Sequence, residues 1–75
     1  MTMYKFFLKD TNYQAVYAAT RGKHVATIEK DGYEYHLYAI GTFFLEVVGY
    51  PKNRTILKTN LFSSGIFLDK YLPFL

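Results

Sequence analysis

The chain has 75 residues, of which 51% are hydrophobic and 20% are aromatic, and its nine Lys and Arg outweigh six Asp and Glu. This composition is too apolar for a disordered chain and the length is too short for two domains, so residues 1–75 are expected to form one domain with a thin core. The sequence has no cysteine, which excludes disulfides, thiolate catalysis and cysteine-based zinc sites.

The charge and the apolar runs indicate where the protein works. A net charge of +3 is mild for a nucleic-acid binder, and the basic residues form no run. The longest uncharged apolar stretch, Leu37 to Leu45, has nine residues, whereas a membrane-spanning helix needs about 20. The N-terminal apolar stretch is too short for a signal peptide. We therefore expect a cytoplasmic protein with no membrane partner.

The first 21 residues give two predicted elements. Residues 4–8 either add an edge strand or cover an edge of the sheet. Residues 11–21 are predicted to form a short helix, because 11–14 has the Thr-x-x-Gln form of a capping box and one stripe at helical spacing carries Tyr13, Val16, Tyr17 and Thr20. A strand remains the alternative there, since aromatic and alanine residues also alternate from Tyr13 to Ala19.

Four strands are predicted next, at residues 23–30, 33–40, 43–50 and 55–62. Asp31-Gly32 between two alternating runs is a strong hairpin signal, because both turn positions need positive φ. A two-residue turn pairs Ile28 with Tyr35, Ala26 with Leu37 and Thr27 with His36. We expect the face of the sheet that carries Ile28, Ala26, Tyr35 and Leu37 to be the core face.

The register around Gly41 decides where Glu46 lies. A strict two-residue loop would place Glu46 beside Leu37 on the core face. Because burying an unpaired carboxylate is costly, we predict a register slipped by one residue, which turns Glu46 outward. In that register the side chains on the core face are those of Phe43, Leu45 and Val47.

The same register continues through the hairpin at Pro51-Lys52-Asn53. It pairs Val47 with Leu57, Phe43 with Leu61, and Glu46 with Lys58. The last pair is a favourable cross-strand ion pair. After the fourth strand, Ser63-Ser64-Gly65 offers a cap for a short C-terminal helix, Ile66 to Leu72, which Pro73 would stop. The predicted fold is α+β, a four-stranded antiparallel meander with a short helix near each end.

The predicted outer face of the sheet is unusually apolar and suggests the function. Three explanations compete: the chain's own segments cover this face, a second copy or another protein binds it, or its aromatic residues stack nucleic-acid bases. We predict a non-enzymatic protein-interaction module that forms a homodimer or binds a protein partner through this face. The interface residues would be Tyr38, Phe44, Glu46, Val48, Ile56 and Lys58.

The alternative function is nucleic-acid binding through the sheet aromatics and the basic hairpin of Lys52, Arg54 and Lys58. No Gly-rich phosphate loop or nucleophile motif occurs, so no catalytic or cofactor-binding residue is predicted. Glu34, His36 and Glu46 share the predicted outer face, but His24 falls on the opposite face. We therefore expect a surface network of strand charges, with neither metal nor cofactor.

Overall fold

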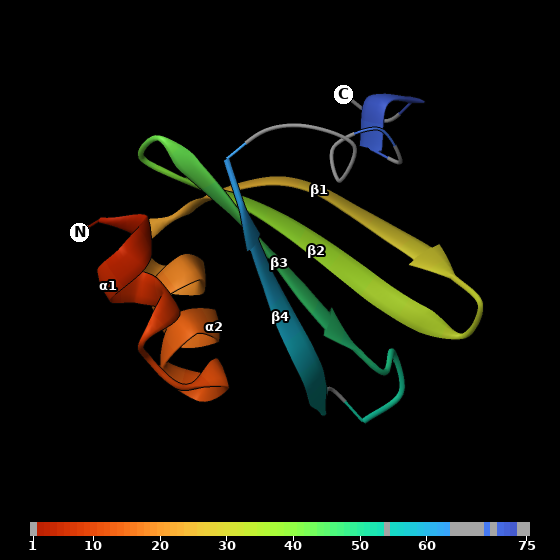
Figure 1. Ribbon diagram of the computed structural model, residues 1–75. Helices are drawn as coiled ribbons and strands as arrows, with labels where there is room; N and C mark the ends of the chain where they lie inside the picture. The colour runs from red at the N-terminus through yellow and green to blue at the C-terminus, as the bar shows by residue number, and fades with distance from the viewer. Residues whose placement is uncertain (1, 54, 64–68, 70, 74–75) are drawn as a thin grey trace.

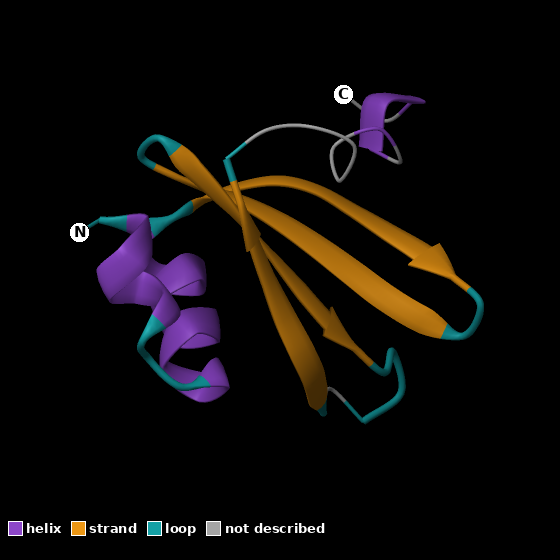
Figure 2. Ribbon diagram, viewed as in Figure 1, coloured by secondary structure: helices purple, strands orange, loops and turns teal. Residues whose placement is uncertain are grey.

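The computed structural model describes residues 2–53, 55–63, 69 and 71–73. Its four strands form a single antiparallel sheet in the order β1-β2-β3-β4, with two helices before them, which confirms the predicted α+β meander (Figures 1 and 2). The elements in chain order are α1 (Met3–Phe7), α2 (Thr11–Arg21), β1 (Lys23–Lys30), β2 (Tyr33–Ile40), β3 (Phe43–Gly49) and β4 (Ile56–Phe62).

The segment expected as an edge strand is instead the helix α1, so that alternative is wrong. Thr2 caps its start, because the Lys5 backbone N–H donates to Thr2 Oγ1 at 3.2 Å. Phe6 is the buried residue of this helix. A single deeply buried aromatic residue therefore anchors a five-residue helix that would be marginal on its own.

The predicted helix at residues 11–21 is confirmed as α2, but its cap differs from the prediction. Asp10 is the N-cap and accepts from the Tyr13 backbone N–H at 2.7 Å. Gln14 is buried instead of reaching back to the cap: its Nε2 donates to the carbonyl oxygens of Phe6 (3.0 Å) and Lys9 (3.2 Å). Its Oε1 accepts from Thr59 on β4. Gln14 thus ties α1 and α2 to the sheet.

The first hairpin has the predicted register. Asp31 and Gly32 take φ values of 54° and 82°, and Ile28 lies opposite Tyr35. The register shifts between His24 and Ala26, where a β-bulge at Val25 places His24 opposite Tyr38. His24 therefore lies on the same face as His36, and the predicted opposite placement is wrong.

The second hairpin corrects the predicted slip. Gly41, at φ 61°, allows the strict two-residue loop, and Glu46 lies opposite Leu37. The prediction failed because it assumed an unpaired carboxylate, whereas Glu46 has hydrogen-bond donors within the protein. The third pairing is also offset from the prediction, since Glu46 faces Asn60 instead of Lys58.

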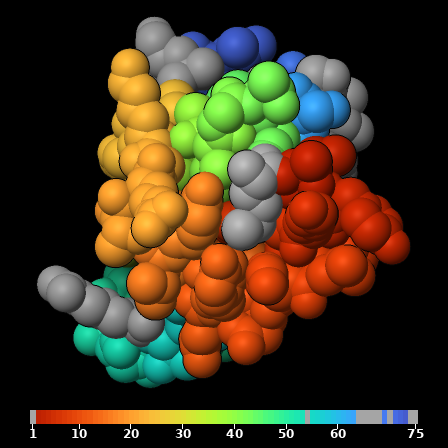
Figure 3. Space-filling model, turned by 90° about the vertical axis from the view of Figure 1, so that its left-hand side faces the viewer, coloured from red at the N-terminus to blue at the C-terminus, as the bar shows by residue number. Residues whose placement is uncertain are grey.

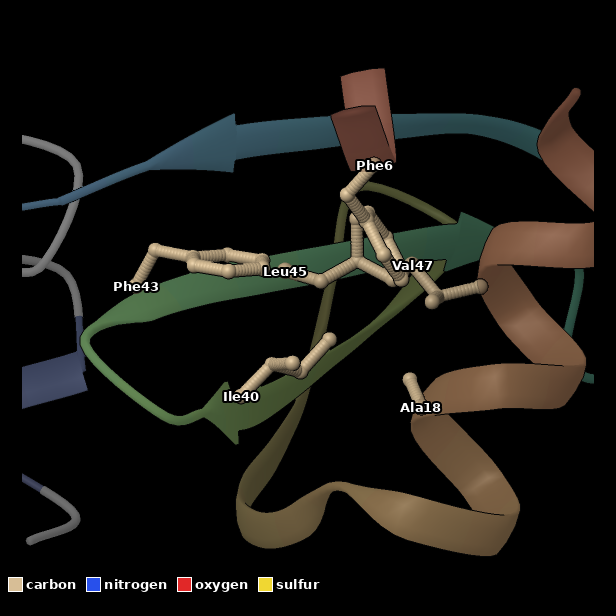
Figure 4. Close-up of a cluster of buried hydrophobic side chains, with 6 residues drawn as sticks. All are labelled: Phe6, Ala18, Ile40, Phe43, Leu45 and Val47. Carbon is tan, nitrogen blue, oxygen red and sulfur yellow. The ribbon is translucent and has the colours of Figure 1, made fainter. Parts of the chain in front are cut away.

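Both faces of the sheet are covered in the described part of the chain. The two helices pack on one face of the sheet, which we call the helix face. It contributes Ile40, Phe43, Leu45 and Val47 to a cluster with Phe6 and Ala18 (Figure 4). The C-terminal turn lies on the opposite face, where Tyr71 packs with Ala26, Ile28, Leu37 and Phe62 (Figure 1). Coverage on two sides explains the nearly continuous apolar sequence of β3.

The C-terminal helix predicted for Ile66 to Leu72 lies mostly outside the described residues. Residues 71–73 form a 3₁₀ turn, and Tyr71 is fully buried. Tyr71 Oη donates to Glu46 Oε2 at 2.6 Å, and Asn60 Nδ2 donates to Glu46 Oε1 at 2.9 Å. Two donors on two carboxylate oxygens offset the cost of burying Glu46, which is 2% exposed.

Tyr71 should make the fold sensitive to alkali. Burial raises the pKa of the Tyr71 hydroxyl well above its usual value, and the hydrogen bond and charge of Glu46 raise this pKa further. In the unfolded chain tyrosine ionises near pH 10. Above that pH the unfolded state binds fewer protons, so the free energy of unfolding should fall by up to about 1.4 kcal/mol per pH unit.

Urea denaturation between pH 8 and pH 11 measures this effect. Tyr71→Phe should flatten the alkaline slope, whereas Tyr4→Phe, at a side chain that is exposed, should leave it unchanged. An identical slope in wild type and Tyr71→Phe would show that the Tyr71 hydroxyl does not stay protonated in the fold.

Candidate interaction surface

The six residues predicted as one interface lie on different faces of the sheet. Tyr38 and Ile56 pack against the cluster beneath the helices. Phe44 packs on the opposite face with the Tyr71 cluster. The shared outward face that the slipped register implied is therefore wrong.

The remaining three predicted interface residues lie at strand positions on the face of the sheet that Tyr71 covers. Glu46 and Val48 are both buried. Lys58 lies opposite Val48 and is exposed. Of this trio, only Lys58 therefore presents its side chain to a partner.

The basic hairpin proposed for nucleic acid is only partly described. Lys52 is exposed in the turn after β3 and lines a hollow together with Glu29. A carboxylate beside Lys52 weakens the attraction of a phosphate backbone to this turn. Arg54 lies outside the described residues.

The largest exposed apolar side chains gather on the helices instead of the strands. Figure 3 shows both helices on one face of the molecule. We call the outer side of α1 and α2, including the turn between them, the helix surface. Its exposed hydrophobic residues are Met3, Tyr4, Phe7, Leu8, Tyr13 and Val16.

Two hollows mark the helix surface. One is apolar, and Met3, Tyr4 and Phe7 line it together with Leu61 of β4. The other lies along α2, has a volume of about 590 Å³, and is both aromatic and basic. Its lining residues are Lys5, Tyr13, Val16, Tyr17, Thr20 and Arg21.

Basic groups surround the aromatic residues of α2. The Lys9 ammonium lies 5.2 Å from the centre of the Tyr13 ring, and the Arg21 guanidinium lies 5.7 Å from that of Tyr17. Residues 1–23 hold four of the nine basic residues and one of the six acidic ones, so they account for the whole net charge of +3. The helix surface is therefore the positive pole of the chain.

Sequence reasoning did not find the helix surface, although a signal was present. The stripe of Tyr13, Val16, Tyr17 and Thr20 predicts a helix, but it does not say which side of that helix faces the sheet. In the structure the buried positions of α2 are Gln14 and Ala18, so most of this stripe faces solvent. Ala18 lies on the opposite side of the same helix, and its small side chain suits close packing on a sheet. This residue therefore indicates which side of the helix faces the sheet.

A polar feature lies on the helix face of β1 and β2, beside the main cluster, since His36 lies opposite Val47 and His24 lies opposite Tyr38. His24 Nε2 is 2.6 Å from Thr27 Oγ1, which is 3.0 Å from His36 Nδ1. His36 Nε2 is 2.6 Å from Glu34 Oε1. We call these four residues the histidine chain. Glu46, expected in this cluster, lies on the other face.

Two absences hold for the described residues. They contain no helix with the length and apolar character that crossing a membrane requires. They also contain no group of three or more His, Cys, Asp or Glu side chains placed to hold a metal ion.

Comparison of the chain with protein-family models finds no match, and comparisons with curated proteins and with solved structures find no significant similarity.

Proposed function

We propose that this protein is a small, non-enzymatic interaction module that binds an acidic protein surface through its helix surface. The observation that carries the proposal is the coincidence of exposed apolar side chains and unbalanced positive charge on one face. Phe7 and Leu8 are about two-thirds exposed, at 68% and 65%. Small monomers rarely leave such groups together in water without a binding role.

The composition of the helix surface favours a protein as the partner. Tyr and Phe are frequent anchors at protein interfaces, where they fill pockets on the other side. Leu8 and Val16 are aliphatic and offer no ring on which a nucleic-acid base could stack. An apolar partner surface is therefore the better match for this combination of side chains.

The charge of the helix surface favours an acidic partner over a second copy. Lys5, Lys9 and Arg21 lie around the exposed apolar groups, and among the described residues none of the three forms an ion pair. Two copies meeting through this surface would bring like charges together, which opposes association. Aspartate and glutamate around an apolar patch would complement it. Homodimer formation stays a prediction and is one outcome of the test.

A displayed library of random peptides is the probe for this proposal. Selected peptides should combine acidic residues with aromatic or aliphatic ones, and their affinity can be measured by calorimetry. Phe7→Asp should weaken binding at least tenfold, because it places a charge in the apolar contact. Leu57→Asp is the matched control, since Leu57 is exposed but lies on β4, and it should bind like wild type.

A pair of charge reversals tests the electrostatic part. Lys5→Glu should reduce the affinity several-fold at low salt, whereas Lys30→Glu, at the end of β1, should not. Peptides that bind Phe7→Asp as well as wild type would overturn the proposal. So would a dimer, measured by light scattering, that Phe7→Asp converts to a monomer, or salt-dependent binding of a single-stranded oligonucleotide by the same surface.

A further inference from the structure

The histidine chain contains two imidazole nitrogens that point at one atom. His24 Nε2 and His36 Nδ1 both lie within hydrogen-bond distance of Thr27 Oγ1, at 2.6 and 3.0 Å. We propose that these two nitrogens bind a divalent transition-metal ion of the zinc and copper class, with Glu34 as the residue that orients His36. His36 lines a hollow together with Val16 of α2, so this site borders the helix surface, but none of its ligands belongs to that surface and the proposal does not depend on its function.

Glu34 selects the tautomer of neutral His36 that a metal needs. An ionised carboxylate only accepts hydrogen bonds, so His36 Nε2 must carry the proton that it donates to Glu34 Oε1 at 2.6 Å. A neutral His36 then presents a lone pair at Nδ1. Metal-binding histidines in proteins commonly have this arrangement, with a carboxylate on the second ring nitrogen.

The donors and acceptors in the rest of the histidine chain follow from that tautomer of His36. Because His36 Nδ1 accepts, the Thr27 hydroxyl donates to it, and His24 Nε2–H donates to Thr27 Oγ1. Metal binding requires His24 to move its proton from Nε2 to Nδ1 and the Thr27 hydroxyl to rotate. Thr27 Oγ1 is then placed to ligate the ion or to hold one of its water molecules.

The β-bulge at Val25 is the second observation behind the proposal. With regular pairing through this region, His24 would face the other side of the sheet. The register shift between His24 and Ala26 brings His24 opposite Tyr38 and onto the face of His36. Bulges commonly redirect side chains next to functional sites. The Tyr38 ring makes an edge contact with the His24 ring at 5.4 Å, which restricts its position.

The distance between the two rings is close to that between two imidazoles that ligate the same ion. Their centres are 6.3 Å apart. Two imidazoles on one ion have ring centres roughly 5 to 6 Å apart, given metal–nitrogen bonds of about 2.0–2.1 Å. His24 is exposed, so its ring has room to rotate toward His36 while it keeps its edge contact with Tyr38.

The ligands select the class of ion. Imidazole nitrogens without sulfur suit zinc, copper and nickel, and the series of affinities places copper(II) above the other two. With two protein nitrogens and one hydroxyl, water must fill the other coordination positions. Protons compete for the same nitrogens, so binding should weaken as the pH falls.

Zinc(II) is the probe, followed by nuclear magnetic resonance of the imidazole nitrogens. His24 and His36 are the two histidines of the chain, so each signal is assigned by a single variant. Zinc should shift His24 Nε2 and His36 Nδ1 together, with one ion per chain. His24→Ala and His36→Ala should each weaken binding at least tenfold, and circular dichroism should show that both variants keep the sheet.

The positioning role of Glu34 has its own matched control. Glu34→Gln should weaken zinc binding by about 10- to 100-fold and change which nitrogen of His36 carries the proton. Glu29 lies opposite Glu34 on the neighbouring strand, so Glu29→Gln removes the same charge without touching His36 and should have little effect. Zinc that shifts one histidine alone, binding unchanged in His24→Ala, or no saturable binding at millimolar zinc would each overturn the proposal.

Discussion

Glu46→Ala is expected to lower the free energy of unfolding by about 3–5 kcal/mol. The substitution removes the acceptor of Tyr71 Oη and of Asn60 Nδ2, and the loss of a hydrogen bond to a charged group costs about 1.5–3 kcal/mol. It also leaves a cavity among fully buried neighbours, Leu37 across the strand pair included. Urea denaturation followed by circular dichroism measures the change.

Two further variants separate charge from packing at Glu46. Glu46→Gln keeps the volume and one acceptor oxygen, so it should cost less than Glu46→Ala. Glu29→Ala removes an exposed carboxylate and should change stability by no more than about 0.5 kcal/mol. The comparison also distinguishes the two registers, because an outward Glu46 paired with Lys58 would contribute only about 0.2–1 kcal/mol. A loss in that lower range would contradict the buried network.

The same residue shows how far the sequence could be read. The first hairpin was predictable because Asp31-Gly32 determines both the turn and the register within a few residues. The second hairpin was not, because the position of Glu46 depends on Tyr71, which lies 25 residues further along the chain. A rule about unpaired carboxylates gives the wrong register when a distant tyrosine supplies the partner.

The placement of the binding surface failed for a related reason. Coverage of the sheet on both faces follows from the packing of Phe6 on one side and Tyr71 on the other. Neither segment gave a strong signal, since α1 is only five residues long. The side-chain pattern of β3 indicated two buried faces, but it could not say which segments cover them. The bulge that turns His24 has no sequence signal in the chain.

Phe6→Ala is expected to cost about 3–5 kcal/mol, as large as the loss at Glu46. Phe6 is fully buried and its ring contacts the rings of Tyr17, at 5.2 Å between centres, and Phe43, at 5.6 Å. A domain of this length has a total stability of about 4–11 kcal/mol, taking about 0.05–0.15 kcal/mol per residue. The variant should therefore lose a large part of its stability and unfold at a clearly lower urea concentration than wild type.

The neighbouring residue provides the control that links this packing to the proposed binding. Phe7 has the same side chain but is 68% exposed, so Phe7→Ala should leave stability within about 0.5 kcal/mol of wild type. Phe6→Ala should lose both stability and peptide binding, because α1 detaches from the sheet and Tyr4 and Phe7 no longer have a fixed position. Phe7→Ala should lose binding alone. If Phe6→Ala binds the selected peptides like wild type under conditions where its strands stay folded, the docked α1 is not the recognition element.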